Sequence, residues 1–166
     1  GFFETLELAR MSLTFDTTVF SDPQGEALAR VYVVAAPSTD VPDDELASLQ
    51  IHGHIVGPTC RYSSTLQATI PLKHRGLTRW GDRTAVVAEA SVPDPCYWST
   101  DLPFQYRAVG GVIGARTSSS VSEFQQPFGI RSLGTSGKRL TFNGRPWVPR
   151  IVHRVEVVEG PPAAAW

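Results

Sequence analysis

His52 and His54 have the spacing that comes nearest to a metal-binding pattern in this sequence. Residues two apart on a β-strand share one face, so both imidazoles could reach a single ion. A third ligand would have to come from His74, His153 or a carboxylate, and no spacing points to one. The pair is therefore expected to lie on a solvent-facing strand, and no metal site is predicted.

Motifs for catalysis are also missing. No Gly-x-Ser-x-Gly elbow occurs, and neither Cys60 nor Cys96 lies in the signature of a catalytic thiol. The glycines at 110, 111 and 114 lie in a strand-like run with no helix behind them, so they predict no phosphate-binding loop. Glycoside hydrolysis needs two carboxyl groups held a fixed distance apart, and no such pair is identifiable. We therefore predict no catalytic residue and no cofactor.

Composition indicates one folded domain of 166 residues, because 42% of the residues are hydrophobic and 19% are charged. The formal net charge of −1 favours neither nucleic acid nor an anionic membrane as a partner. No apolar run approaches the roughly 20 residues that a membrane-spanning helix needs. Cys60 and Cys96 are expected to be two thiols, with a single disulfide as the alternative.

The start of the chain carries no recognisable secretory signal. Gly1 followed by Phe2 resembles the remnant of a cleavage, so an earlier signal could have been removed. The sequence therefore leaves the compartment open.

Glycines and prolines divide the chain into short alternating runs, which is typical of an all-β sandwich. The expected strands cover 11–20, 27–36, 49–56, 64–72, 84–92, 104–115, 128–133 and 139–142. Segment 73–83 is expected to be a polar connection, and 134–137 a loose turn. Asn143-Gly144 predicts a type I′ hairpin turn. Seven or eight strands with short links predict an antiparallel β-sandwich without a long helix.

Two segments carry motifs that occur together in a known family. Segment 92–107 (VPDPCYWSTDLPFQYR) contains an aromatic residue and Trp-Ser between prolines, before a strand. Segments 128–131 (FGIR) and 140–150 (LTFNGRPWVPR) follow in the same order and spacing. These motifs resemble glycoside hydrolase family 2 enzymes, including β-galactosidases and β-glucuronidases. Phe142 stands where the family usually has Leu, and Ile151 where it has Gly.

The resemblance implies an immunoglobulin-like sandwich over residues 1–133. Residues 134–166 would then be a hairpin and linker that lead into a TIM barrel outside this sequence. The family's catalytic glutamates lie in that barrel, so none can be assigned to this chain. The expected role is that of a non-catalytic domain that supports carbohydrate hydrolysis by the barrel of a parent glycosidase. A carbohydrate-binding β-sandwich module is the alternative.

The resemblance also suggests which residues contact the barrel. Contacts with the barrel are expected at Arg131, Asn143, Trp147, Arg150 and His153. Under the alternative, sugar contacts are expected at aromatic residues, namely Tyr62, Trp80, Trp98 or Trp147. Without the barrel, residues 146–166 would expose apolar side chains, so a dimer through this C-terminal segment is predicted, with a tail folded back onto the sandwich as the alternative.

Overall fold

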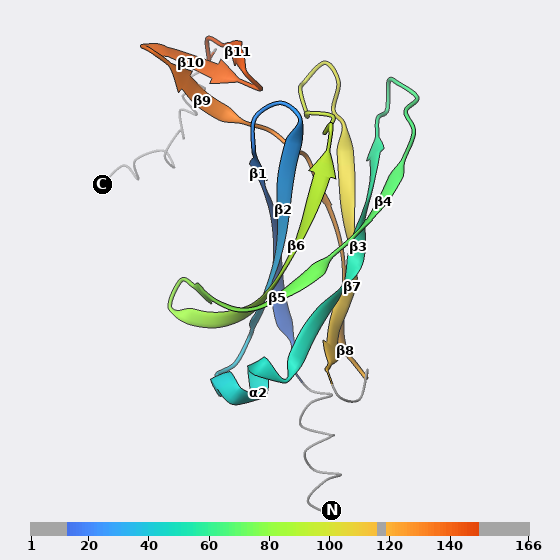
Figure 1. Cartoon of the computed structure of the whole chain (residues 1–166), viewed down its shortest axis with the longest axis vertical. Coiled ribbons are helices and arrows are strands. Elements are labelled where there is room, and N and C mark those ends of the chain that lie inside the picture. Colours follow the sequence, from blue (N-terminus) through green and yellow to red (C-terminus); the bar gives the residue numbers. More distant parts are fainter. Residues whose placement is uncertain (1–12, 116–118, 150–166) are drawn as a thin grey trace, which may run out of the picture.

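The computed structural model describes residues 13–115 and 119–149, and most of them lie in two facing antiparallel sheets (Figure 1). The first sheet consists of four strands, which follow one another across the sheet in the order β1 (Phe15–Pro23), β2 (Leu28–Pro37), β6 (Arg83–Pro93) and β5 (Lys73–Trp80). The second sheet also has four strands, in the order β4 (Ala68–Pro71), β3 (Leu49–Thr59), β7 (Gln105–Gly114) and β8 (Ser120–Phe128).

This strand order identifies the type of sandwich. If the eight strands are lettered A, B, C, C′, D, E, F and G along the chain, the sheets are A-B-E-D and C′-C-F-G. That is the order of immunoglobulin-like domains. The prediction of an all-β, immunoglobulin-like sandwich with about eight strands is therefore confirmed. The one helix in the described part, α2 (Asp43–Ala47), is too short and polar to cross a membrane.

The core forms because alternate residues of each strand point between the sheets. On β2, Val31, Val33 and Ala35 are completely buried. Val33 lies opposite Ala88 of β6, which is also completely buried. The second sheet supplies facing side chains from β3 and β7, namely Leu49, Ile51, Ile55, Ala108 and Val112.

Tyr106, near the start of β7, ties the preceding loop to the second sheet. Only 2% of this residue is exposed. Its hydroxyl accepts a hydrogen bond from the Cys96 backbone N–H at 2.9 Å. Burial raises the pKa of this hydroxyl. A tyrosine in this position, bonded back to the upstream backbone, is a feature of immunoglobulin-like domains. It therefore supports the strand lettering independently.

The hairpin between β5 and β6 makes contacts across the outer face of the first sheet. Trp80 stacks on Phe20 of β1 with ring centroids 5.6 Å apart, and Phe20 stacks on Tyr32 at 5.1 Å. Arg83 donates a hydrogen bond to the Pro37 carbonyl at 2.8 Å. The expectation that 73–83 is only a polar connection was wrong. Its polar residues form edge strand β5, whose side chains need little burial.

A third, small sheet follows the sandwich (Figure 1). It contains β9 (Leu133–Ser136), β10 (Arg139–Phe142) and β11 (Arg145–Pro146). The predicted hairpin turn is confirmed, because Asn143 and Gly144 have φ angles of 51° and 77° and Phe142 pairs with Arg145. The strand expected at 128–133 was placed wrongly, since β8 ends at Phe128. The loose turn expected at 134–137 was also wrong, because these residues mostly belong to β9.

Candidate functional site

Asn143 fastens the small sheet to the end of the sandwich. Its side-chain Nδ2 donates to the Trp98 carbonyl at 2.9 Å, and its Oδ1 accepts from the Ser132 N–H at 3.0 Å. Its own backbone N–H donates to the Ser132 carbonyl at 2.8 Å. Asparagine tolerates the left-handed φ of the turn better than most residues. Asn143 therefore adopts the positive φ that the turn requires and also forms the hydrogen bonds that attach the small sheet to the sandwich.

Trp98 forms the other half of this attachment. The Arg131 guanidinium carbon lies 4.9 Å from the centroid of the Trp98 ring, a cation–π contact. The backbone N–H of Trp98 donates to the Ile130 carbonyl at 2.7 Å. A Cβ on Gly129 would lie 2.9 Å from the Trp98 Cβ, so this glycine permits the close approach. Three predicted site residues, Trp98, Arg131 and Asn143, are thus brought together within the chain itself.

The small sheet exposes a set of large apolar side chains. Leu133, Leu140, Trp147 and Val148 have exposed fractions of 68%, 45%, 42% and 82%. The Trp147 ring is tilted against Phe142 at a centroid distance of 5.7 Å, and the backbone N–H of Trp147 donates to the Leu140 carbonyl at 2.9 Å. Residues around Trp147 and the β9–β10 turn enclose a groove of about 390 Å³. Trp147 therefore has a defined position while much of its surface is accessible.

Arg150 and His153, the other two residues expected to contact a barrel, lie outside the described residues.

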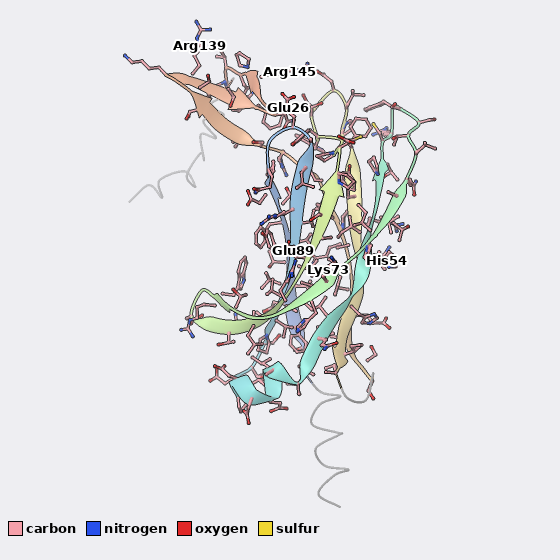
Figure 2. All side chains as sticks on the ribbon, viewed as in Figure 1. Glu26, His54, Lys73, Glu89, Arg139 and Arg145 are labelled. Carbon is pink, nitrogen blue, oxygen red and sulfur yellow. The ribbon has the colours of Figure 1, made fainter. Side chains whose placement is uncertain are left out.

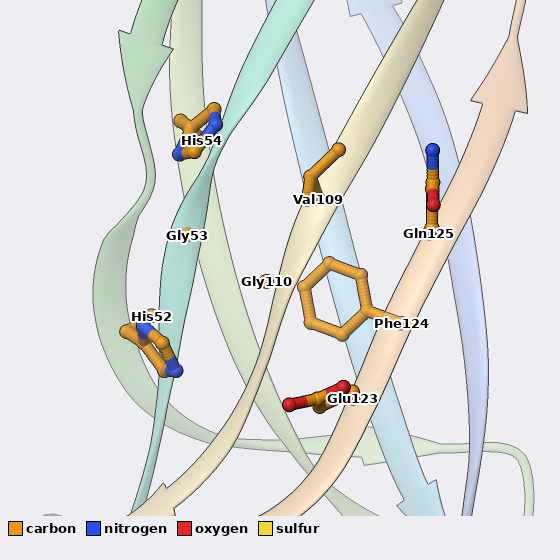
Figure 3. Close-up of a pocket in the computed structure, with 8 residues that line it drawn as sticks. All are labelled: His52, Gly53, His54, Val109, Gly110, Glu123, Phe124 and Gln125. Carbon is orange, nitrogen blue, oxygen red and sulfur yellow. The ribbon is translucent and has the colours of Figure 1, made fainter.

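A second groove, of about 580 Å³, lies on the second sheet (Figure 3). His52 and His54 line it from β3, and Glu123 and Gln125 line it from β8. His52 and Glu123 are both paired with Gly111 of β7, so a residue without a side chain separates them. Glu123 was not predicted, because nothing in the sequence indicates which strand lies across from β3.

The described residues supply no complete set of metal ligands at this groove. No group of three or more His, Cys, Asp or Glu residues able to hold a metal ion occurs in residues 13–115 and 119–149. Zinc sites in proteins usually use at least three protein ligands. Within the part of the chain that the structure describes, the two histidines are thus an incomplete ligand set.

The aromatic residues expected to bind sugar do not form one surface. Tyr62 is 65% exposed in the β3–β4 loop, with the Arg61 guanidinium carbon 5.5 Å from its ring centroid. Trp80 lies near the tip of the β5–β6 hairpin, towards the other end of the sandwich from that loop (Figure 1). Trp98 contacts Arg131, as described above. A sugar chain could therefore not stack on all three in one binding site.

Cys60 and Cys96 are both free and half-buried. Neither has a partner expected of a catalytic thiol in the described residues.

The fold also explains why the pKa values of two further side chains, Tyr97 and His74, are shifted. Burial, with a smaller effect from Glu26, raises the pKa of Tyr97, whose hydroxyl donates to the Gly25 carbonyl at 2.8 Å. Burial lowers the pKa of His74, whose Nδ1 accepts from the Ile51 N–H at 3.4 Å. Both contacts join segments of the sandwich, and neither belongs to a set of reacting groups.

No protein-family model matches this sequence, and no curated protein matches it. Among solved structures, the chain is similar to a β-glucuronidase from Bifidobacterium dentium in complex with coumarin-3-O-glucuronide. That likeness has a TM-score of 0.51 at 18% identity and covers 79% of this chain and 19% of that chain. It is also similar to a glycosyl hydrolase family 2 member from Bacteroides cellulosilyticus. There the TM-score is 0.52 at 19% identity, over 81% of this chain and 16% of that chain.

At these identities the likeness establishes the fold. The chain is an immunoglobulin-like β-sandwich with the fold of one part of family 2 glycosyl hydrolases. The resemblance predicted from segments 92–107, 128–131 and 140–150 is thereby confirmed at the level of fold. The chain spans less than a fifth of the length of these similar proteins, 19% of one and 16% of the other.

Proposed function

We propose that this chain is a non-catalytic domain of a family 2-like glycoside hydrolase, in which a separate barrel hydrolyses the glycosidic bond. The observation that carries the proposal is the likeness to a small part of much longer glycosidases. The described residues fit it, because they contain no paired carboxylates, activated nucleophile or metal centre among the contacts at either groove.

In this proposal the domain positions the chain that leads into the barrel. Asn143 and the Arg131–Trp98 contact hold the small sheet against the sandwich. Trp147 and Val148 then present apolar surface to the neighbouring domain. We accordingly propose residues 1–133 as the sandwich and 134–166 as the connecting segment. The small sheet begins close to this division, at Leu133.

A dimer of the isolated chain follows from the same surface. Exposed Trp147 and Val148 would pair with a second copy when no barrel covers them. Size-exclusion chromatography of the chain with and without residues 146–166 should show a dimer only for the longer form. A monomer in both cases would reject the dimer.

The domain role is tested by incubating the 166-residue chain with 4-nitrophenyl β-glucuronide and β-galactoside. We expect no release of nitrophenol above the buffer rate. Hydrolysis that a single Asp→Asn or Glu→Gln substitution abolishes would show that the chain is itself an enzyme. The alternative role as a carbohydrate-binding module is less well supported, because Tyr62, Trp80 and Trp98 lie apart.

A further inference from the structure

The turn of the small sheet joins two groups that can react with each other. The side-chain amide of Asn143 and the backbone nitrogen of Gly144 are close enough along the chain to close a five-membered ring, as in other fast intramolecular reactions. Glycine has no Cβ to hinder the approach of its nitrogen. Asparagine is one of the thermolabile residue types, and Asn143 is the only asparagine in the sequence.

The reaction is deamidation. The Gly144 nitrogen attacks Cγ of Asn143, so that an N–Cγ bond forms while the Cγ–Nδ2 bond breaks. Nδ2 leaves as ammonia and takes the proton of the Gly144 nitrogen with it. Water then opens the cyclic imide at one of its two carbonyl groups, which gives either aspartate or isoaspartate. The net change replaces NH2 by OH, so water is the only co-reactant.

The attached small sheet holds this reaction back. Asn143 has a φ of 51°, and a type I′ turn sets its ψ near about 30°. Ring closure needs the Gly144 nitrogen in the plane of Cα, Cβ and Cγ of Asn143, which requires a large change in that ψ. The side-chain amide is also fixed at both ends, by bonds to the Trp98 carbonyl at 2.9 Å and from the Ser132 N–H at 3.0 Å. The sheet must therefore detach and its turn must open before the ring can close.

Deamidation removes the donor that fastens the small sheet. A carboxylate oxygen replaces Nδ2, so the Trp98 carbonyl loses its donor and faces a second acceptor. Glu26 adds a charge effect, because its Oε1 lies 3.8 Å from the position that a Cβ on Gly144 would occupy. Figure 2 shows Glu26 at this junction, near Arg145 of the small sheet. A new negative charge at position 143 is repelled by the Glu26 carboxylate. Isoaspartate also lengthens the backbone within the turn, which disrupts the pairing of Phe142 with Arg145.

We propose that Asn143 is a deamidation site that detachment of the small sheet exposes, and that the modification then makes the detachment permanent. While the sheet is attached, the reaction is slow. Each opening allows the ring to close, and the product cannot restore the bond to the Trp98 carbonyl. The modification depends only on contacts within this chain, so it does not require the proposed domain role.

The test follows deamidation of the 166-residue chain at mildly alkaline pH, in buffer and in concentrated urea. Ion-exchange chromatography separates the product by its added negative charge. Chromatography and mass spectrometry of the peptide that contains residue 143 then distinguish asparagine, aspartate and isoaspartate. Because two hydrogen bonds must break before the ring closes, the folded chain should react roughly tenfold or more slowly than the chain in urea.

Two substitutions separate detachment of the small sheet from global unfolding. Arg131→Ala removes the cation–π contact with Trp98 and leaves the Asn-Gly pair intact, so it should speed deamidation in buffer about twofold to fivefold. Trp80→Ala is the control, because it loses the stack on Phe20 in the sandwich and leaves the attachment unchanged. Its rate in buffer should match that of the parent sequence. In urea all three chains should react equally fast.

Hydrogen exchange of the separated product measures the consequence. The backbone N–H of Trp98, which donates to the Ile130 carbonyl, should lose protection at least about tenfold in the deamidated chain. The backbone N–H of Val33 in the core is the internal control and should keep its protection.

The proposal is overturned if the folded chain deamidates as fast as the chain in urea, because the attachment would then exert no control. Equal rates for Arg131→Ala and Trp80→Ala in buffer also overturn it, as does a deamidated chain in which Trp98 keeps its full protection. None of these outcomes affects the nitrophenyl glycoside assay, so a failure here is distinguishable from a failure of the domain role.

Discussion

Asn143→Ala is predicted to release the small sheet from the sandwich. The substitution removes the hydrogen bonds to the Trp98 carbonyl and from the Ser132 N–H. At about 0.5–1.5 kcal/mol for each bond, their loss costs about 1–3 kcal/mol. The φ of 51° adds about 1 kcal/mol for an alanine, because its Cβ disfavours the left-handed region. The attachment should therefore weaken by about 2–4 kcal/mol.

Hydrogen exchange measures this attachment directly. Two backbone N–H groups form part of this attachment: that of Asn143 donates to the Ser132 carbonyl, and that of Trp98 donates to the Ile130 carbonyl. Their protection should fall by at least about 30-fold in Asn143→Ala, since about 1.4 kcal/mol corresponds to a factor of ten and the loss is about 2 kcal/mol or more. The amide of Val33 in the core of β2 serves as the internal control, and its protection should change only with global stability.

Two further substitutions separate the contributions. Asn143→Gly tolerates the positive φ and loses both side-chain bonds, so its effect should be smaller than that of alanine by about 1 kcal/mol. Asn143→Asp keeps the acceptor for Ser132 and loses the donor to Trp98. If alanine and glycine both leave the two amides as protected as before, the attachment does not depend on Asn143, and the reasoning fails.

Three other predictions concern the sandwich. Tyr106→Phe removes the acceptor of the Cys96 N–H and should lower the free energy of unfolding in urea by about 1–3 kcal/mol; an unchanged midpoint would contradict that role. Trp80→Ala loses the stack on Phe20 and should destabilise the fold by about 1 kcal/mol or more, whereas Tyr62→Ala should cost less than about 0.5 kcal/mol. Equal melting temperatures for these two variants would refute the contrast. Burial lowers the pKa of His74 from its ordinary value of 6.5, so the unfolded chain binds more protons and stability falls as pH drops through this value. His74→Gln should reduce that slope in urea unfolding between pH 7 and 5, and an unaltered slope would exclude His74 as its source.

The sequence predicts the sandwich well where strands are central. β2 and β6 carry long runs of Val and Ala that alternate between faces, and Asn143-Gly144 has the chemistry of one specific turn. These features are local, so a pattern along the chain contains them. The same is true of the family resemblance, which depends on short contiguous motifs.

Two of the four edge strands, β5 and β8, were predicted poorly for a physical reason. β5 and β8 are rich in Lys, Arg, Ser and Gln, because an edge strand with solvent-facing side chains needs few apolar residues. Polar runs of this kind cannot be told from loops by hydrophobic alternation. The strand placed at 128–133 instead of 120–128 is the clearest example.

The contacts at the candidate sites could not be predicted, because they depend on pairing between distant segments. Glu123 faces His52 only through the register of β3, β7 and β8. The bond from Asn143 to Trp98 joins residues 45 positions apart. Residue type alone suggested sugar contact for Trp98, but its position beside Arg131 and Gly129 gives it a part in holding the small sheet.

The central claim is that this sandwich serves a catalytic barrel in the same polypeptide. Sequencing the messenger RNA past the codon for Trp166 tests it most directly. We expect an open reading frame long enough for a barrel, roughly 250 residues, with a pair of carboxylates placed at the ends of its strands. A stop codon immediately after Trp166 would contradict the account.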